Sequence, residues 1–236
     1  MKVLVTGANG FLGTHLVKAL SEIPIIDVLT YTRDDDLNSL YFKLIESDFI
    51  FHLAGVNRPK NNDEFFFSNI QLTSDITNFL HKYKIKSPIY FSSSVHADNL
   101  SNYGVSKLFA EELIKDLSRK NGNKVFNVRL VGVFGPGGIP FYNSVVATFC
   151  KQIVCGDNLL IHDPDKIIQL IYIDDLIKSM RHTLLNQKLL PYKPVNSISL
   201  KHLSSVISSF RDGSETKINI NEYFLKCLRE TYEFYL

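Results

Sequence analysis

Short apolar runs alternate with longer segments of helical periodicity along the first part of the chain. The apolar runs are KVLVT, IIDVLTYT, DFIFHLAG, SPIYFSSS and KVFNVRLVGVFG. They are nearly continuous in apolar residues, which is typical of strands that are covered on both faces. Because helices separate these strands, we expect parallel strands joined by right-handed crossovers. The pattern therefore predicts an α/β fold with a doubly wound parallel sheet.

The segments between these runs have the spacing of helices with one buried face. They predict helices over about residues 11–22, 37–45 and 63–83, and a fourth helix that begins near Tyr103.

After Gly138 the pattern becomes less regular. It predicts three further helices, an extended piece in IIQLIYI and an amphipathic tail helix in NEYFLKCLRETYEFYL. The three helices are expected near residues 141–155, 173–185 and 200–210. We therefore expect one domain over residues 1–236. Its core covers about 1–138, and a small lobe over about 139–236 packs on the carboxyl end of the sheet.

Composition excludes several classes of function. The chain has 236 residues, 45% of them apolar, and its net charge of +2 comes from evenly spread signs. No basic face for nucleic acid or an acidic membrane is therefore expected. No apolar run is long enough to cross a bilayer, and no signal-like segment precedes the first strand. Cys150, Cys155 and Cys227 have no metal-type spacing, so we expect reduced, buried thiols in a cytoplasmic protein without a metal site.

Three glycines follow the first strand in VTGANGFLGTHL. The first allows a tight turn, the second lets the backbone approach a pyrophosphate, and the third lets helix and strand pack closely. The alternative is a strand–helix turn with no ligand, but the place of the motif between the first strand and the first helix favours a dinucleotide. The prediction is a Rossmann-like fold whose cofactor contacts here are Gly7, Asn9, Gly10, Phe11, Leu12 and Gly13.

The end of the second strand indicates which dinucleotide is bound. A carboxylate there usually receives the ribose hydroxyls of NAD, whereas arginine suits the 2′-phosphate of NADP. Thr32 and Arg33 stand at this place and favour NADPH over NADH. Three aspartates, Asp34, Asp35 and Asp36, follow directly and weaken that inference, although acidic residues are also common in the first turn of a helix.

A tyrosine and a lysine stand four residues apart after a run of serines. Tyr103 and Lys107 share a helical face, and a nearby ammonium is expected to lower the pKa of the tyrosine. The pair alone is weak evidence, since it occurs by chance on many helices. Together with the glycine turn and the serines at the end of the fourth strand, it predicts general acid–base chemistry.

At this point the chain resembles the extended short-chain dehydrogenase/reductases that act on nucleotide sugars. The resemblance is carried in order by TGANGFLG, FHLAG, FSSS, YGVSK, RLVGVFGPG and YIDD. It implies that Tyr103 is the catalytic acid and base and that Lys107 activates it and binds the ribose. It also implies that Ser94 holds the reacting oxygen, with Ser93 as the next candidate.

The same resemblance extends to the cofactor and to the small lobe. It implies that the cofactor is lined by the FHLAG segment, at His52, Leu53, Ala54 and Gly55. Asn69 would lie near the helix of Tyr103, and Asp174 in YIDD would tie the small lobe to the sheet. One departure concerns substrate choice, because Gly132 stands where the family usually carries asparagine.

A narrower resemblance is to the reductase half of the CapF (WbjC-type) capsular polysaccharide enzymes. It rests on HLAGVNRP, SSSVHA, YGVSK, FYNSVVATFC and FLKCLRETYEFYL. It implies NADPH-dependent reduction of a UDP-2-acetamido-2,6-dideoxy-4-keto-sugar. In those enzymes a metal-binding cupin epimerase domain follows, which this sequence does not contain, so we expect either a longer protein or a cupin partner in trans. The superfamily further implies a homodimer.

Three residues are weaker candidates for substrate binding. Arg58 would contact the substrate or remain a solvated loop residue, and His96 would face the substrate or stay an ordinary turn histidine. Asn143 would touch the sugar or, as its place favours, cap a helix. Two rival functions are a nucleotide-sugar 4-epimerase with tightly bound NAD and a dinucleotide-binding sensor without catalysis. The complete Ser, Tyr and Lys set argues against the sensor.

Overall fold

The computed structural model describes residues 1–59, 61, 63–193, 196–214 and 218–236. It divides into two compact units. Unit 1 comprises residues 1–130 and 183–189, and unit 2 comprises residues 131–182 and 190–236. The division thus falls before the boundary expected near residue 138, because the short strand over 132–134 pairs within unit 2.

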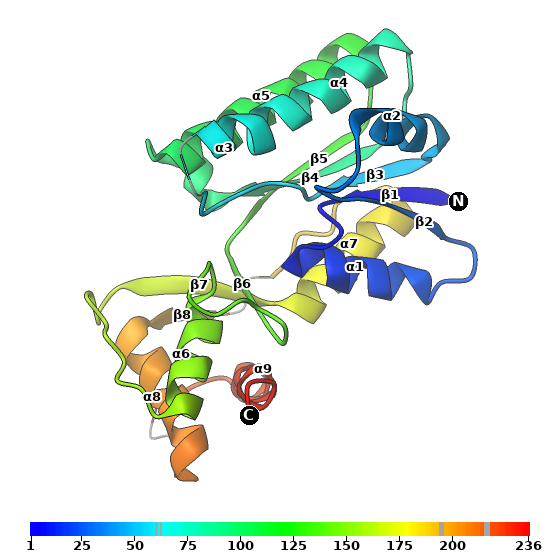
Figure 1. Cartoon of the computed structure of the whole chain (residues 1–236). Helices are drawn as coiled ribbons and strands as arrows, with labels where there is room; N and C mark the ends of the chain where they lie inside the picture. Colours follow the sequence, from blue (N-terminus) through cyan, green and yellow to red (C-terminus); the bar gives the residue numbers. More distant parts are fainter. Residues whose placement is uncertain (60, 62, 194–195, 215–217) are drawn as a thin grey trace. The chain divides into compact units, whose positions relative to one another are not determined.

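Unit 1 is built on a five-stranded sheet in which every pair of strands is parallel, as predicted (Figure 1). The strands lie in the order β2-β1-β3-β4-β5. Their bounds are β1 Lys2–Thr6, β2 Asp27–Tyr31, β3 Phe49–His52, β4 Ile89–Ser94 and β5 Val125–Leu130. The chain winds outward in both directions from β1 and β3, so the switch point of the topology lies between these two strands. In such Rossmann-like sheets, ligands bind outside the carboxyl ends of the strands at this point.

The predicted helices of unit 1 are present, with one internal change. They are α1 Phe11–Ser21, α2 Leu37–Glu46 and α5 Asn102–Asn121, whereas the helix predicted over 63–83 has three parts. These parts are α3 Asp63–Phe65, the π-helix η1 Phe66–Gln71 and α4 Leu72–Lys82. π-Helical turns inside α-helices are frequent at functional sites. A short 3-10 helix, η2 Val95–Asp98, joins β4 to α5.

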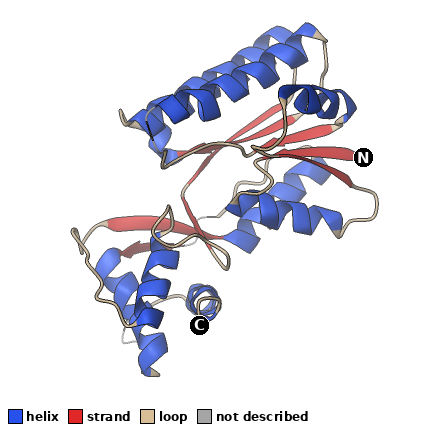
Figure 2. Ribbon diagram, viewed as in Figure 1, coloured by secondary structure: helices blue, strands red, loops and turns tan. Residues whose placement is uncertain are grey.

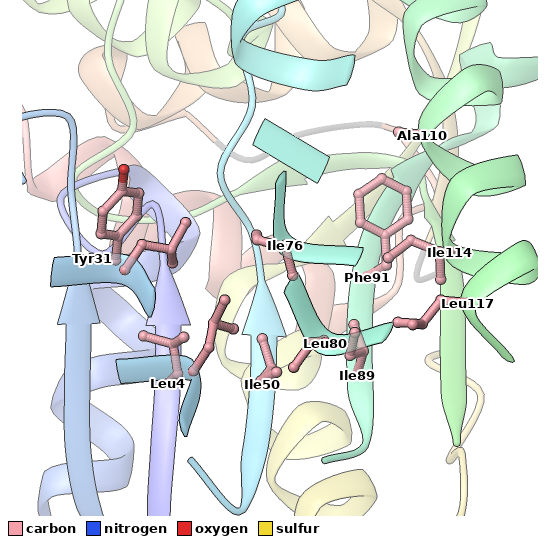
Figure 3. Close-up of a cluster of buried hydrophobic side chains, with 12 residues drawn as sticks. Leu4, Tyr31, Ile50, Ile76, Leu80, Ile89, Phe91, Ala110, Ile114 and Leu117 are labelled. Atoms are coloured by element: carbon pink, nitrogen blue, oxygen red, sulfur yellow. The ribbon is translucent and has the colours of Figure 1, made fainter. Parts of the chain in front are cut away.

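The core of unit 1 lies between the sheet and the helices α2, α4 and α5 (Figure 3). In Figure 1 these helices cover one face of the sheet and α1 covers the other. Full burial of an aliphatic side chain contributes about 1.5–3 kcal/mol, so this cluster is a major source of stability. Its members are Leu4, Tyr31, Leu40, Leu44, Ile50, Ile76, Leu80, Ile89, Phe91, Ala110, Ile114 and Leu117.

Unit 2 has a sheet of its own in the order β6-β7-β8 (Figure 2). Strands β6 Gly132–Phe134 and β7 Ile167–Tyr172 are parallel, and β8 Asn196–Ser199 is antiparallel to β7. The run KVFNVRLVGVFG is therefore two strands in two sheets, not one. The other elements of unit 2 are the helices α6 Val145–Cys155, α7 Ile173–Asn186, α8 Leu200–Asp212 and α9 Glu222–Glu233, and the end of α7 belongs to unit 1.

Helix α6 begins later than predicted, and a different residue caps it. The Ser144 hydroxyl accepts a hydrogen bond from the Ala147 amide at 3.2 Å, while Asn143 is exposed one residue earlier. The expectation that Asn143 caps this helix is therefore wrong. Phe141, where the helix was expected to begin, has a φ of +59°, which is incompatible with a right-handed helix.

Asp175 accepts hydrogen bonds from the Tyr223 hydroxyl at 2.9 Å and so joins α7 to α9, whereas Asp174 is exposed. One further expectation for unit 2 needs correction. Among the cysteines, Cys155 is exposed, and only the other two are buried thiols. In the part of the chain that the structure describes, no helix combines the length and the apolar character needed to cross a membrane.

Candidate active site

The turn between β1 and α1 has the conformation that the glycine spacing predicts. Gly7 has a φ of +70°, and a Cβ at this position would come within 2.8 Å of the Ala54 backbone. A Cβ on Gly13 would collide with the Gly7 carbonyl, so only glycine allows α1 to pack this closely. Gly10 is the N-cap of α1 and provides no side-chain acceptor. The amides of the first turn are thus left for a phosphate, as in other dinucleotide sites.

The remaining residues of the two predicted cofactor segments lie at the same edge of the sheet. Asn9 is exposed, and Phe11 and Leu12 are half-buried in the first turn of α1. Leu53 and Ala54 are half-buried directly after β3, next to the strand that leads into the glycine turn. The structure therefore brings the two segments together at the switch point between β1 and β3.

His52 is enclosed by protein groups on both sides of its ring. Its Nδ1 is hydrogen-bonded to Thr6 Oγ1 at 2.8 Å and its Nε2 to Thr73 Oγ1 at 2.9 Å. Burial, with a smaller effect of the Lys107 charge, lowers the pKa of His52 to about 3, so the ring is neutral. The side chain links β1, β3 and α4 and is fully buried, whereas the residues that follow it, Leu53 to Gly55, are half-buried or exposed.

Tyr103 lies on the first turn of α5, close to the end of β4. Its hydroxyl is hydrogen-bonded to Ser94, the last residue of β4. The phenol ring lies between Phe65, at 6.1 Å between ring centroids, and His96, at 6.3 Å. The two aromatic neighbours and the serine fix the position of the hydroxyl at the carboxyl edge of the sheet.

The pKa of Tyr103 differs from the sequence-based expectation. Burial raises it, and the hydrogen bond from Ser94 opposes this only in part. The expected lowering by Lys107 is absent because the ammonium is held elsewhere, by the Ser92 carbonyl oxygen at 2.9 Å. The phenol therefore keeps its proton at neutral pH, which suits a group that donates a proton.

Lys107 is fully enclosed one helical turn after Tyr103. Its Nζ lies 5.0 Å from the centroid of the Phe91 ring, and a Cβ on Gly55 would come within 3.1 Å of it. Burial lowers the pKa of Lys107 to about 8, and the carboxylate of Glu111 opposes this shift. The ammonium is thus charged at neutral pH and lies beside the FHLAG segment.

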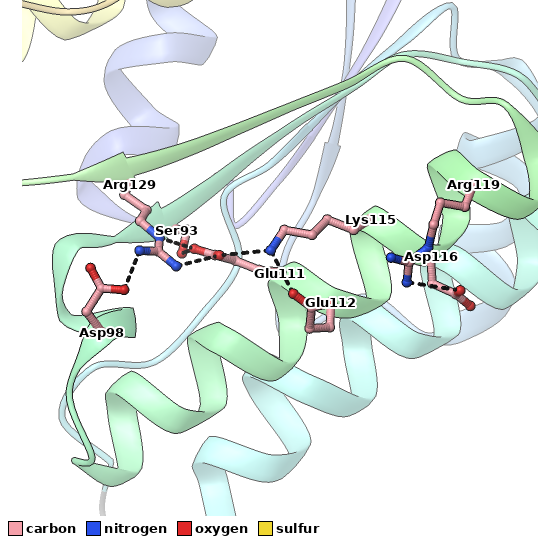
Figure 4. Close-up of polar contacts among 8 residues, drawn as sticks. All are labelled: Ser93, Asp98, Glu111, Glu112, Lys115, Asp116, Arg119 and Arg129. Atoms are coloured by element: carbon pink, nitrogen blue, oxygen red, sulfur yellow. Dashed lines mark hydrogen bonds and ion pairs between the residues drawn. The ribbon is translucent and has the colours of Figure 1, made fainter.

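Sequence reasoning missed a buried carboxylate on the same helix (Figure 4). Glu111 is 1% exposed, and it accepts hydrogen bonds from Arg129 Nε at 2.8 Å and Nη2 at 2.9 Å. The Ser93 hydroxyl donates to the same carboxylate at 2.5 Å, and Arg129 also pairs with Asp98 of η2. The spacing in the sequence could have identified Glu111, because it follows Lys107 by four residues, as Lys107 follows Tyr103, and so lies on the same helical face.

This network affects both serines that were considered for the substrate. Burial alone would raise the pKa of Glu111, but the hydrogen bonds from Arg129 and Ser93 outweigh it and lower the pKa. Glu111 is therefore ionised, and the Ser93 hydroxyl is directed to it rather than to Tyr103. Ser94, the last residue of the strand, is instead the serine that is hydrogen-bonded to Tyr103.

Asn69 of the π-helix joins the segment after β3 to α5. Its side chain accepts a hydrogen bond from the Val56 amide at 2.7 Å and donates to the Val56 carbonyl and to Ser106 Oγ, both at 2.9 Å. The predicted place of Asn69 beside the helix of Tyr103 is confirmed. Asn69 is the buried residue of η1, and its hydrogen bonds connect this π-helix to α5.

The weaker substrate candidates are less tightly gathered. His96 lies against Tyr103 and is hydrogen-bonded through Nδ1 to Asn99 at 3.2 Å. Arg58 is exposed in the loop after β3. Asn143 belongs to unit 2, whereas the other two belong to unit 1.

A separate cavity of about 450 Å³ lies within unit 2. It is bordered by β8 and by the starts of α8 and α9, and its polar lining includes Asp165, Lys201, His202 and Asn221. None of the residues predicted from the sequence lines it, and the Ser94, Tyr103 and Lys107 set belongs to the other unit. Within the described ranges, no three His, Cys, Asp or Glu side chains gather as they would around a metal ion.

Comparison with known proteins identifies the class to which this fold and site belong. The model of the NAD dependent epimerase/dehydratase family matches residues 3–196. The chain belongs to this family. Its Rossmann-like sheet, glycine turn and Tyr–Lys pair are thus those of an extended short-chain dehydrogenase/reductase.

Individual relatives add detail. The chain is 37% identical over 242 residues to UDP-2-acetamido-2,6-beta-L-arabino-hexul-4-ose reductase of Pseudomonas aeruginosa, an alignment that covers all of this chain and 65% of the relative. The structure of the capsular polysaccharide assembling protein CapF from Staphylococcus aureus matches with a TM-score of 0.87 and 30% identity, over 100% of this chain and 66% of that one. This chain therefore spans just under two thirds of the length of both.

A more distant match supports the fold alone. UDP-glucuronic acid 4-epimerase from Bacillus cereus, solved in complex with NAD, matches with a TM-score of 0.85 at 20% identity, over 100% of this chain and 98% of that one.

Proposed function

We propose that this protein is an NADPH-dependent reductase of a UDP-linked 2-acetamido-2,6-dideoxy-4-keto-sugar in the synthesis of capsular polysaccharide or O-antigen precursors. The observation that carries the proposal is the hydrogen-bonded Ser94 and Tyr103 pair, with the Lys107 ammonium one turn away, at the carboxyl edge of the sheet. The identity to a 4-keto-sugar reductase supports the substrate class.

The residues present fit a nicotinamide dinucleotide. The glycine turn leaves amides for the pyrophosphate, and Lys107 beside the FHLAG segment is placed to hold the ribose. When bound, the reduced cofactor supplies a hydride for carbon 4 of the sugar. The proposed preference for NADPH rests on Arg33, which is exposed directly after β2 and would meet a 2′-phosphate.

Each residue of the set has one role in the proposed reaction. Tyr103 keeps its proton at neutral pH and donates it to the oxygen on carbon 4 as negative charge develops there. The Ser94 hydroxyl orients that oxygen by hydrogen bonding. The Lys107 ammonium, held by the Ser92 carbonyl oxygen beside the FHLAG segment, would bind the ribose of the cofactor.

The proposal is tested by the cofactor that the purified protein carries and by the reaction it performs. We expect little bound nucleotide after purification and oxidation of added NADPH only when a UDP-linked 4-keto-sugar is present. The absorbance of NADPH at its long-wavelength band follows the reaction. Tightly retained NAD together with interconversion of UDP-sugars would instead identify a 4-epimerase. NADPH binding without turnover of any keto-sugar would identify a sensor.

We further propose that the protein is a homodimer. Four exposed aromatic and aliphatic side chains lie on the contacting elements η1 and α5 and form the η1–α5 patch: Phe66, Phe67, Leu108 and Phe109. Their exposure on neighbouring elements of unit 1 supports burial against a second copy of the chain.

A cupin epimerase acting in trans is the further partner that we propose. We also propose that the reaction takes place in the cytoplasm.

Replacing Phe109 by Glu is expected to yield a monomer, because a charge would have to be buried in the paired patch. Sedimentation equilibrium at micromolar concentration measures the mass. Phe42→Glu is the matched control, since Phe42 is 71% exposed on α2 and lies outside the patch. A monomeric wild type, or a Phe109 variant that remains dimeric, would exclude this interface.

A further inference from the structure

The three aspartates that follow Arg33 have three different environments. Asp36 caps α2, because its side chain accepts a hydrogen bond from the Ser39 amide at 2.7 Å. Asp34 is exposed, whereas Asp35 is half-buried. Sequence alone treats the three as one acidic run, so the question is which carboxylate is able to meet a bound nucleotide.

The carboxylate of Asp35 is fully used by protein donors. Its Oδ1 accepts from Lys43 Nζ at 2.6 Å and from Ser39 Oγ at 3.2 Å. Its Oδ2 accepts from the Thr32 amide at 2.8 Å and from Thr32 Oγ1 at 3.0 Å. An ionised carboxylate offers about four acceptor positions. All of them are taken, and the hydrogen bonds from Lys43 and Thr32 lower the pKa of Asp35 to about 2.

The Asp35 carboxylate lies where a dinucleotide site is expected to bind the ribose hydroxyls. The Gly7 amide donates to the Tyr31 carbonyl at 2.9 Å, so the glycine turn is joined to the end of β2. Lys43 Nζ lies 5.7 Å from the centroid of the Tyr31 ring and therefore reaches the same end of the strand. Asp35 comes 22 positions after Gly13, near the place where an acidic residue receives the ribose 2′-hydroxyl in NAD sites.

We propose that the ion pair between Lys43 and Asp35 sets the nucleotide preference of the site by withholding the Asp35 carboxylate from the ribose. Lys43 neutralises the charge of Asp35 and occupies its oxygen, which leaves Arg33 as the group that faces a 2′-phosphate. Lys43 is then a specificity-determining residue that acts through Asp35 from α2. The inference rests on the proposed dinucleotide function and explains how the site favours NADPH despite its acidic run.

The test measures the dissociation constants of NADPH and NADH by calorimetry on the full chain. Lys43→Met is expected to lower the preference for NADPH by about tenfold, because the freed carboxylate repels a 2′-phosphate and accepts from a 2′-hydroxyl. The double variant Lys43→Met with Asp35→Asn is expected to restore the preference to within about threefold of the wild type. Lys2→Met is the matched control, since it removes the same charge from an exposed pair with Glu46 at the opposite edge of the sheet.

Different results would contradict the proposed cofactor and the proposed role of the ion pair. A wild type that prefers NADH would overturn the proposed cofactor. A further shift toward NADH in Lys43→Met would even then support the proposed role of the Lys43–Asp35 ion pair in nucleotide preference. The inference is overturned if Lys43→Met weakens both cofactors equally, leaves their ratio unchanged, or is not rescued by Asp35→Asn. Thermal melts of all variants establish that the compared proteins are folded.

Discussion

Replacing Tyr103 by Phe is expected to lower turnover of a UDP-linked 4-keto-sugar by about 100-fold to 10,000-fold, the range that positioned acid–base groups contribute. The phenol is the group that burial keeps protonated beside Ser94, so its hydroxyl is the donor that the reaction would lose. The ring itself remains between Phe65 and His96, so the site should keep its shape. Only the hydrogen bond to Ser94 is lost, which costs about 1 kcal/mol of folding free energy.

The measurement is steady-state oxidation of NADPH with keto-sugar, combined with calorimetric binding of the cofactor. Cofactor affinity should stay within about threefold of the wild type, because the phenol acts on the sugar oxygen. Tyr83→Phe is the control, since Tyr83 is 54% exposed at the end of α4. Unchanged turnover in Tyr103→Phe, with normal folding, would remove Tyr103 from the mechanism.

Replacing Lys107 by Met is expected to abolish activity while making the folded protein more stable at neutral pH. The pKa of Lys107 is about 8 in the folded chain, against about 10.4 for an unperturbed lysine in an unfolded one. Below about pH 8 both states carry the charge, and its burial then costs the folded state about 3 kcal/mol. The variant avoids this cost, but it also loses the hydrogen bond to the Ser92 carbonyl, which is worth about 1 kcal/mol.

The pH dependence isolates this effect. Between about pH 8 and pH 10.4 the unfolded chain binds a proton at this lysine that the folded chain lacks. The free energy of unfolding of the wild type therefore rises with pH across this window. The difference in unfolding free energy between Lys107→Met and wild type should therefore shrink across this window. Urea titrations at several pH values measure it, with Lys120→Met at the exposed end of α5 as control. A variant that is less stable at pH 7, or a difference that does not change with pH, would contradict the assignment.

Stability and function thus oppose each other at Lys107. A buried ammonium is unfavourable for folding, and the protein keeps it where the sheet and α5 enclose a charge beside the FHLAG segment. The Glu111 carboxylate on the same face opposes the loss of its proton. Perturbed groups of this kind are concentrated at functional sites, which agrees with the proposed role.

The sequence by itself determined much of unit 1. The glycine spacing after the first strand predicts the tight turn from the sequence alone, because no side chain fits between Gly7 and Ala54 or between Gly13 and the turn. Apolar runs gave the five parallel strands, since both faces of the sheet are covered. The four-residue spacing placed Tyr103 and Lys107 on one face of α5, because helical geometry is local.

Only the tertiary structure decided how neighbouring polar residues divide their roles. Ser93 and Ser94 are equivalent in the sequence, yet one bonds to Glu111 and the other to Tyr103. That outcome depends on where α5 lies across the strand, and the partner Arg129 comes from another strand. The pKa of Tyr103 also required the structure, since the direction of the Lys107 ammonium cannot be read from spacing.

The same limit applies to the acidic run after β2 and to the division of the chain. The sequence placed an arginine and three aspartates at the end of a strand, but which carboxylate is free depends on Lys43, eight residues beyond Asp35. Likewise, the run from Val125 to Phe134 has the sequence of one extended segment, and its split into β5 and β6 follows from pairing with two different sheets. Local patterns fix backbone conformation and the direction of a face, whereas charge pairing and strand partners arise between segments that only the folded chain brings together.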